Sequence, residues 1–342
     1  RYSTDKKWHI PHFEKMLYDN AQLVSLYSKA YQITKNNIYK KVVFETLEFI
    51  EKELTSPEGV FYSSLDADSY NAYHILEEGA YYSWTKEELK SILKNDFQLF
   101  SNYYNINEYG FWEAEKYVLI KSVNDITFTK ENNISISEFE SKKNLWKKKL
   151  KKSQEKRKKP RLDDKSLTSW NALMINGYLD AYTVFNKKDY LKAAEKTAQF
   201  ILKNQLTDEG KLFHNYKNGK VSINGYLEDY AATAKAFIQL YEITSNEIWL
   251  QKAEILTEYS ITNFYDEASM MFYFTSKKDP LLVAKIIEYQ DNVIASSNSI
   301  MAKNLFSLSH HLDNNRYKEM AIAMLNNVKS EITNNASSFS NW

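Results

Sequence analysis

The sequence of 342 residues has no cysteine, only 7 glycines and 4 prolines, and no long apolar run. Without cysteine the chain forms no disulfide, thiolate metal site or cysteine nucleophile. Few glycines and prolines mean few chain breakers, which favours helices over a turn-rich β fold. No apolar run approaches the roughly 18 residues that span a bilayer, so we expect no membrane association. With no visible signal peptide we predict a cytoplasmic location, although the start at Arg1, within a motif, indicates a fragment.

Charge is balanced overall but unevenly distributed along the chain. The 45 Lys and Arg residues against 44 Asp and Glu residues disfavour a uniformly basic nucleic-acid-binding protein. Residues 140–161, however, hold 12 Lys or Arg against two Glu, with Leu145, Trp146 and Leu150 at helical spacing. We interpret this segment as an exposed, solvated helix with a thin apolar stripe. Contact with nucleic acid or an anionic membrane is the weaker alternative.

An internal repeat organises most of the remaining sequence. Four segments share a phase when they are aligned at Asn20, Asn171, Tyr230 and Asn298, and an aromatic residue lies nineteen positions beyond each. Turn-forming Asn or Ser residues precede each of these aromatics, which indicates a helix, a short turn and a second helix. The predicted first helices cover residues 18–35, 168–186, 228–244 and 296–312, and the second helices cover 38–54, 188–204, 247–264 and 316–333.

Helical pairs of this kind cannot bury their apolar faces singly and must stack. An open solenoid and a closed (α/α) toroid both satisfy this requirement, but aromatic residues on both helices favour the toroid. Three of the pairs end in a turn followed by aromatics, which predicts small β hairpins. A long insertion over residues 59–160 separates the first two pairs. We therefore predict an all-α toroid over residues 1–342, with this insertion and its β hairpins.

Polar and aromatic side chains gather at the predicted starts of the first helices. In a toroid these starts converge on one depression, where free N–H groups and positive helix ends favour anions and hydroxyl oxygens. N-capping by Ser, Thr, Asp and Asn is the alternative interpretation. It does not explain the aromatics and second carboxylates beside the caps. The candidate binding residues here are Tyr18, Asp19, Asn20, Trp170, Asn171, Glu228, Tyr230, Asp291, Asn292 and Asn298.

Several titratable residues are candidates for acid–base chemistry. His12 titrates near neutral pH, and Glu14 could orient it. Asp66 and Asp68 would point to one side of an extended strand, as an acid–base pair, a cation site or a solvated turn. The candidate catalytic residues are His12, Asp66, Asp68, Asp164 and Asp229.

Motifs for metal or cofactor binding are absent from the sequence. The six histidines show no HExxH or similar spacing, and no GxSxG, P-loop or GxGxxG run occurs. We therefore predict no metal site and no cofactor.

The run over residues 11–23, PHFEKMLYDNAQL, is long and specific. With Arg1-Tyr2-Ser3-Thr4-Asp5 and Trp8, it resembles the signature of the thioredoxin-domain-containing, spermatogenesis-associated-protein-20-like family (the DUF255 proteins). Further matches follow in the order of the family over residues 66–69, 78–85, 163–171, 227–231 and 291–299. The resemblance covers nearly the whole chain.

This resemblance implies an (α/α)6 toroid of the six-hairpin glycosidase type, related to N-acylglucosamine 2-epimerases. Four of the six hairpins would lie in this chain, the first would precede Arg1 and the last would follow Trp342. A thioredoxin-like domain, an implied partner, would also lie upstream. Ala172 and Ser297 replace glycines that are common in the family.

The leading hypothesis is a carbohydrate-active protein whose partner is a small sugar or glycan. Aromatic faces would stack on sugar C–H groups, and carboxylates and amides would bind hydroxyl groups. Hydrolysis needs two carboxylates about 5–5.5 or 6.5–9.5 Å apart. Epimerisation needs two bases, of which His12 could be one. The His-bearing rim and the implied kinship to epimerases slightly favour isomerisation. The rival hypothesis is a non-catalytic scaffold that binds a glycan or peptide. The proposed aromatic faces are Trp8, Trp84, Trp170, Tyr18 and Tyr230.

Overall fold

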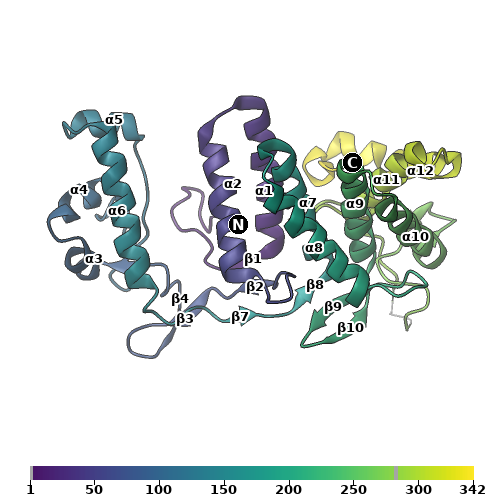
Figure 1. Ribbon diagram of the computed structural model, residues 1–342, viewed down its shortest axis with the longest axis horizontal. Helices are drawn as coiled ribbons and strands as arrows, with labels where there is room; N and C mark the ends of the chain where they lie inside the picture. Colours follow the sequence, from purple (N-terminus) through teal and green to yellow (C-terminus); the bar gives the residue numbers. More distant parts are fainter. Residues whose placement is uncertain (1–2, 281–283) are drawn as a thin grey trace. The chain divides into compact units, whose positions relative to one another are not determined.

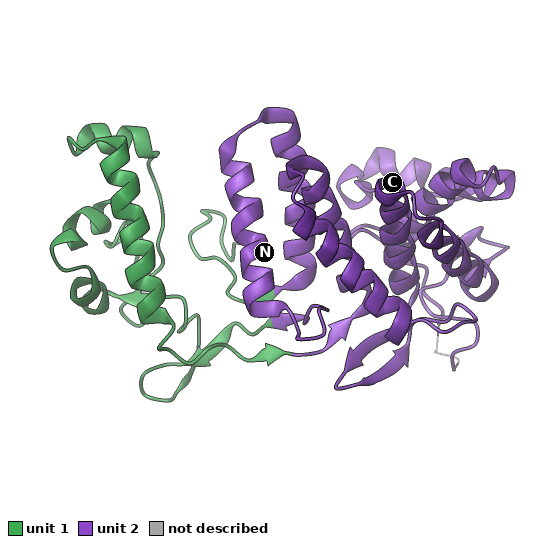
Figure 2. Ribbon diagram, viewed as in Figure 1, with its two compact units in different colours: residues 1–15, 65–163 green, residues 16–64, 164–342 purple. Residues whose placement is uncertain are grey.

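The computed structural model describes residues 3–280 and 284–342, so Arg1 and Tyr2 of the N-terminal motif lie outside the described residues. The chain divides into two compact units, shown in Figure 2. The helical-pair unit comprises residues 16–64 and 164–342, and the insertion unit comprises residues 1–15 and 65–163. The segment predicted as an insertion over 59–160 thus forms most of a compact unit, together with the first fifteen residues.

The described part of the helical-pair unit contains four consecutive helical pairs (Figure 1). Every helix begins and ends within one residue of its predicted range when the π-helical turn η1 (Ile50–Leu54) is counted with α2. The first helices are α1 (Leu17–Thr34), α7 (Thr168–Phe185), α9 (Leu227–Thr244) and α11 (Ser297–His311). The second helices are α2 (Asn37–Phe49), α8 (Lys188–Asn204), α10 (Glu247–Phe264) and α12 (Asn315–Asn334), which the turn η3 (Ala336–Phe339) follows.

The first helices form an inner layer and the second helices an outer layer. Helix α7 packs between α1 and α9, and α9 packs in turn on α11. Each outer helix packs mainly on the inner helix of its own pair. The sequence explains the difference, because α7 is apolar or small on nearly all sides and buries most of its length, whereas α8 buries one amphipathic face.

The turns inside the pairs repeat one local geometry. Lys35, Asn186 and Ser245 follow the inner helices in the left-handed conformation, with φ between 52° and 55°. Asn36 and Asn246 then cap the outer helices, each accepting a hydrogen bond from the backbone N–H two residues later. These polar residues end one helix and start the next within a short turn, which fixes the antiparallel pairing.

Short strands follow the outer helices and separate the pairs. An isolated bridge joins Thr55 to Phe61, another joins Leu206 to Leu212, and β11 (Tyr265–Asp266) pairs with β12 (Met271–Phe272). Strand β8 (Ser166–Leu167) pairs with β9 (Phe213–Lys217), which also pairs with β10 (Lys220–Asn224). Three two-residue strands lie where the chain passes between units: β1 (Lys15–Met16), β2 (Ser64–Leu65) and β7 (Leu162–Asp163).

The insertion unit has its own aromatic core. Its helices are α3 (Lys86–Leu93), the turn η2 (Lys94–Asp96), α4 (Phe97–Tyr104), α5 (Asp125–Glu131) and α6 (Ile136–Gln154). A predicted β hairpin is present as β3 (Asp68–Tyr70) with β4 (Leu76–Glu78). Strand β5 (Trp84–Thr85) pairs with β6 (Lys116–Tyr117), but α3 and α4 lie between them in the chain. The core includes Phe100, Tyr103, Phe128, Phe139 and Trp146.

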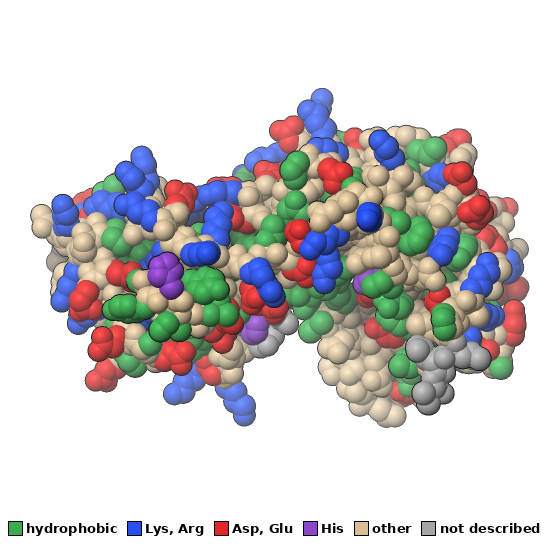
Figure 3. Space-filling model, turned by 90° about the horizontal axis from the view of Figure 1, so that it is seen from below, with side chains coloured by type: hydrophobic (Ala, Val, Ile, Leu, Met, Phe, Trp, Pro, Cys, Tyr) green, Lys and Arg blue, Asp and Glu red, His purple; other side chains and the backbone are tan. Residues whose placement is uncertain are grey.

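The basic segment serves partly as structure within the insertion unit. Trp146 and Leu150 of α6 are buried in the aromatic core. Lys142 pairs with Asp96 at 3.1 Å, and the guanidinium of Arg157 lies 3.9 Å from the ring centroid of Trp84. On the face shown in Figure 3, basic and acidic side chains are interspersed. None of the described helices is long and apolar enough to cross a membrane.

Candidate functional site

The starts of α1, α7 and α9 adjoin in the helical-pair unit. The rings of Tyr18 on α1 and Trp170 on α7 meet edge to face, with centroids 4.7 Å apart. The backbone N–H of Ser169 on α7 donates to Oδ1 of Asp229 on α9 at 2.9 Å. Residues that lie at separate helix starts in the sequence are therefore neighbours in the fold.

Asp229 is the centre of this arrangement and is fully buried. Its Oδ1 accepts the N–H of Ser169, and its Oδ2 accepts the N–H of Tyr226 and the Nδ1–H of His214, each at 2.9 Å. The bond to Tyr226 caps the start of α9, whereas the other two bonds reach α7 and strand β9. Asp229 thus holds three elements together and fixes the orientation of His214.

His214 lies on β9, and 16% of its side chain is exposed. Since a carboxylate can only accept, the contact with Asp229 places a proton on Nδ1 and directs Nε2 away from it. Burial by itself lowers the pKa of His214, but the hydrogen bond and charge of Asp229, aided by Glu228, outweigh burial and raise the pKa. When His214 is protonated, its Nε2–H therefore points away from Asp229 and is available for transfer.

Glu228 is the third member of the cluster. Burial raises its pKa to about 7, and the charges of Asp229 and Glu288 act in the same direction while His214 opposes them. One ligand atom each of His214, Glu228 and Asp229 lies within 4.8 Å of the other two. A carboxyl group that titrates near pH 7 beside a proton-bearing imidazole can serve as acid and base under physiological conditions.

Within residues 3–280 and 284–342, these same three side chains form the group of His, Asp and Glu whose geometry could hold a metal ion. Both oxygens of Asp229 already accept hydrogen bonds from three N–H groups. A cation would have to compete with these donors, which leaves His214 and Glu228 as the available ligands. The donor set thus suits proton transfer better than a closed metal site.

Three predicted binding residues, Asn171, Tyr230 and Asn298, link neighbouring repeats. The amide of Asn171 accepts the N–H of Phe61 at 2.8 Å and donates to the carbonyl of Phe61 at 2.9 Å. Asn298 makes the equivalent pair of bonds with Phe272, both at 2.9 Å. The hydroxyl of Tyr230 accepts the N–H of Leu212 at 2.9 Å. Each of these side chains thus hydrogen-bonds to the backbone segment that ends the preceding pair, which is a structural role. Substrate binding by these side chains stays a prediction.

The fourth helix start is also tightly bonded. Oδ1 of Asp291 accepts the N–H of Ser296 at 2.8 Å and the hydroxyl of Ser299 at 2.9 Å. The side chain of Asn292 bonds to the next backbone N–H at 2.9 Å. Glu288 accepts both the N–H and the hydroxyl of Ser297. Asp291 thus supports the start of α11, whose N-cap is Ser296, and its Oδ2 also accepts the N–H of Asn341 at 2.7 Å. Substrate binding by Asp291 and Asn292 stays a prediction.

The remaining candidates of the helical-pair unit lie around the first two starts. Asn20 donates to the carbonyl of Met16 at 2.7 Å, and Asp19 is partly exposed in the same turn. Asp164 pairs with Lys217 at 2.5 Å, and this hydrogen bond lowers the pKa of Asp164. Asp164 therefore differs from Glu228, whose pKa is raised into the range needed for proton transfer.

Six predicted site residues belong to the insertion unit and are described within it. Trp8 is 79% exposed, with φ of 57°. Trp84 is 3% exposed, and Arg157 covers its ring, so its face is occupied. Asp66 and Asp68 are partly exposed, and Asp66 pairs with Arg161 at 3.5 Å. The other two, His12 and Glu14, are partly exposed. Participation of all six in the candidate site stays a prediction.

Sequence reasoning missed His214 as a candidate. It stands alone in the sequence, fifteen residues before Asp229, and no motif marks it. The available signal was its position in the first strand of the β hairpin that precedes the third inner helix. Glu228 was placed among binding residues because its raised pKa depends on burial, which the sequence alone does not show.

No family model matches the chain. Spermatogenesis-associated protein 20 of Homo sapiens is 30% identical over 95% of this chain and 45% of its own length. An uncharacterized protein of Caenorhabditis elegans is 31% identical over 94% of this chain and 47% of its own length. The chain thus spans about half the length of the curated relatives that it matches.

Solved structures of low sequence identity share the fold. A sugar epimerase from a ruminal bacterium has a TM-score of 0.58 at 12% identity, over 93% of this chain and 61% of that chain. Cellobiose 2-epimerase from Bacillus thermoamylovorans has a TM-score of 0.58 at 10% identity, over 96% and 64%. A glycoside hydrolase family 76 α-mannanase from Bacteroides thetaiotaomicron has a TM-score of 0.51 at 11% identity, over 93% and 62%. The predicted fold class, an (α/α)6-type toroid with small β hairpins, is confirmed.

Proposed function

We propose that the protein acts on a sugar by acid–base catalysis at the cluster of His214, Glu228 and Asp229. The observation that supports this most directly is Glu228, whose pKa is raised to about 7 beside a histidine oriented by a buried carboxylate. The fold adds support, since it is shared with sugar epimerases and a mannanase. A proton-transfer pair on that fold suits a sugar substrate.

Epimerisation or isomerisation fits this cluster better than hydrolysis. Hydrolysis by two carboxylates needs one of them to attack the sugar or to activate water. Asp229 is fully buried and both of its oxygens are bonded, so it does not fit either role. Glu228 and His214 can instead exchange protons with a carbon and an oxygen of a sugar.

The proposed reaction begins with Glu228 in its ionised form and His214 protonated on Nε2. Glu228 removes the proton from the carbon next to the sugar carbonyl, while His214 donates its Nε2 proton to the carbonyl oxygen, which gives a neutral enediol. Glu228 then passes its proton to the neighbouring carbon while His214 takes the hydroxyl proton from the first carbon, which gives the isomer. If a proton from solvent instead reaches the opposite face of the first carbon, His214 takes back the proton of the former carbonyl oxygen and Glu228 loses its proton to solvent, which gives the epimer. Asp229 stabilises the charged imidazole throughout and keeps Nε2 directed at the substrate.

The experiment is an NMR assay of the full chain with a panel of aldoses, ketoses and disaccharides in D2O. Epimerisation incorporates deuterium at the reacting carbon, whereas hydrolysis releases reducing ends without it. Glu228→Gln and His214→Gln are expected to lower turnover by about a hundredfold or more, the usual contribution of a positioned acid or base. Glu247→Gln on α10 and His310→Gln at the end of α11, both exposed, serve as matched controls.

Unchanged turnover in Glu228→Gln would remove the cluster from catalysis. Reducing-end release without deuterium incorporation would replace isomerisation by hydrolysis. Sugar binding without any turnover would favour the scaffold alternative. Roles for His12, Asp66, Asp68 and Asp164 are further proposals that the same assay can test with their alanine variants. A thioredoxin-like partner domain and a cytoplasmic location stay proposals as well.

A further inference from the structure

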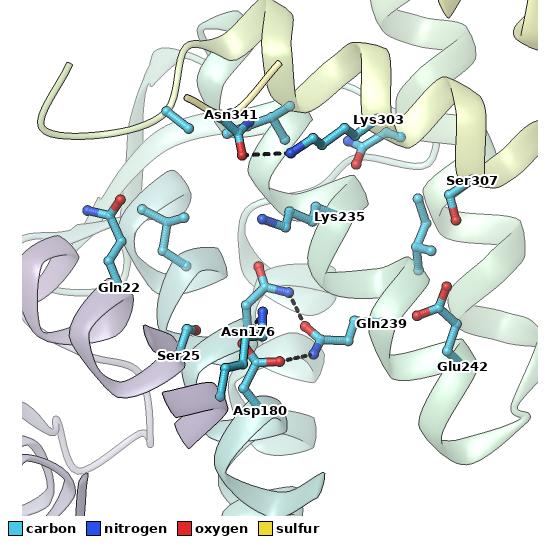
Figure 4. Close-up of a pocket in the computed structure, with 16 residues that line it drawn as sticks. Gln22, Ser25, Asn176, Asp180, Lys235, Gln239, Glu242, Lys303, Ser307 and Asn341 are labelled. Atoms are coloured by element: carbon cyan, nitrogen blue, oxygen red, sulfur yellow. Dashed lines mark hydrogen bonds and ion pairs between the residues drawn. The ribbon is translucent and has the colours of Figure 1, made fainter. Parts of the chain in front are cut away.

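A cavity of about 450 Å³ lies between the four inner helices of the helical-pair unit, as Figure 4 shows. About 15 water molecules occupy this volume in liquid water, so the cavity has room for a monosaccharide with a substituent. Residues of α1, α7, α9 and α11 line it, so every inner helix contributes. The lining is rich in amide and amine groups, in contrast to the apolar interior of the same helices.

The cavity continues the face of α9 that carries Glu228. Glu228, Lys235 and Glu242 are spaced seven residues apart, so they lie along one stripe of the helix. Lys235 is displaced from Glu228 by about 10 Å along the helix axis, at 1.5 Å per residue. Glu228 itself does not line the cavity, so binding in the cavity does not require contact with Glu228.

Lys235 is a charged group in the cavity that lacks a partner. Within the described residues, no hydrogen bond or ion pair joins Lys235 to the protein, and Figure 4 shows it reaching from α9 into the cavity. The acidic side chains of the lining are engaged elsewhere, since Asp180 pairs with Lys29 at 3.1 Å and Glu242 bonds to His311 at 3.2 Å. Burial lowers the pKa of Lys235, and the charges of Lys29 and Lys303 lower it further while Asp180 opposes them.

A chain of amides leaves one acceptor open beside Lys235. The carboxylate of Asp180 accepts the amide N–H of Gln239 at 2.8 Å, and the amide oxygen of Gln239 accepts the N–H of Asn176 at 2.5 Å. Because a carboxylate only accepts, this chain fixes the orientation of both amides. Oδ1 of Asn176, a residue 5% exposed, is then buried and has no donor among the described residues.

These two unmet groups define complementary chemistry. An open amide oxygen requires a hydroxyl donor, and an uncompensated ammonium requires an anionic oxygen. Lys303, whose Nζ donates to Asn341 at 3.0 Å, adds positive charge without an acidic partner at hydrogen-bond distance among the described residues. We propose that this cavity binds a sugar that carries an anionic group, with the anion on Lys235 and a sugar hydroxyl on Asn176. The choice of a sugar rests on the proposed function; the choice of an anion rests on the cavity alone.

Isothermal titration calorimetry of the full chain with glucose, glucose 6-phosphate, glucuronate and inorganic phosphate tests this proposal. At least one of the two anionic sugars is expected to bind about tenfold or more tightly than glucose and than inorganic phosphate, equivalent to one well-placed charged contact. Comparison of glucose 6-phosphate with glucuronate identifies a phosphate or a carboxylate as the anion.

Lys235→Gln should abolish that preference, whereas Lys235→Arg should retain it. Lys203→Gln, on the exposed side of α8, is the matched control and should leave it unchanged. Circular dichroism checks that each variant is folded. Equal affinity for glucose and both anionic sugars, an unchanged preference in Lys235→Gln, or binding of inorganic phosphate as tight as that of the sugars would overturn the proposal.

The test separates this inference from the proposed function, because binding is measured without turnover. Glu228→Gln should still prefer the anionic sugar. If turnover is absent but the Lys235-dependent preference persists, the proposed function fails and the anionic-sugar site stands. If neutral sugars are turned over and no anionic sugar is preferred, the outcome is the reverse.

Discussion

Replacement of Asn171 by alanine tests how the repeats are joined. Asn171 is fully buried and makes three hydrogen bonds: it accepts from the N–H of Phe61 and donates to the carbonyls of Phe61 and Leu167. Alanine cannot make these bonds, and water does not reach the site to replace them. The backbone groups of Phe61 would then be left without partners inside the protein.

The expected loss follows from the number of bonds. Three net hydrogen bonds and the penalty for an unpaired buried N–H together amount to about 3 kcal/mol in the free energy of unfolding. Asn298→Ala should cost a similar amount, since Asn298 makes the equivalent bonds to Phe272 and one to Glu288. Tyr230→Phe removes one bond to Leu212 and should cost about 1–2 kcal/mol.

Amide hydrogen exchange is the appropriate assay because it reports the helical-pair unit separately from the insertion unit. For Asn171→Ala the amide of Phe61 should exchange about a hundredfold faster, the equivalent of about 3 kcal/mol. Gln251→Ala, an exposed amide on α10, is the control and should change little. Unchanged protection of Phe61, or a larger effect for Tyr230→Phe than for Asn171→Ala, would refute the reasoning.

Three further predictions concern charged groups. The pKa of Glu228 is raised in the folded protein from 4.5 to about 7, so protonated Glu228 stabilises the fold fully below the lower value, and this contribution is lost as pH rises through the higher one. Thermal denaturation should therefore show that Glu228→Gln gains stability relative to the parent protein between about pH 5 and about pH 8. A stability difference that does not change with pH would contradict this. Arg157→Met should destabilise the insertion unit by about 2 kcal/mol, measured by exchange of its amides, because the carbonyls of Ala80, Tyr81 and Ser83 lose their donor. The basic helix α6 should show no binding to heparin at physiological salt in a titration, since its charges are partly paired; binding that weakens steeply with salt would restore the polyanion interpretation.

The helical repeat could be recognised from the sequence for local reasons. Apolar spacing along each helix and polar turn residues between helices depend on neighbours within a few positions, so the eight helix ranges agree with the structure to within one residue. The stacking of the pairs followed from their number and from aromatics on both layers. The compactness of residues 65–163 was not visible, because that core is assembled from side chains far apart in the chain, such as Trp84 and Trp146.

The candidate site divides in the same way. The sequence identified Asp229, Glu228, Asn171 and Asn298 because acidic and amide side chains are favoured at helix starts. It could not separate their roles, since capping, linking of repeats and proton transfer use the same residue types. Hydrogen bonds in the folded protein separate these roles, because Asn171 bonds to the backbone of Phe61, whereas Asp229 bonds to the ring of His214.

The sequence by itself determined the elements and their repetition, because helix formation and turn chemistry are governed by adjacent residues. Only the tertiary structure decided which charges are buried together. The pKa of Glu228 depends on Asp229, His214 and Glu288, and the unpaired state of Lys235 depends on where Asp180 and Glu242 find their partners. Burial and charge proximity join positions far apart in the chain, so no local pattern contains them.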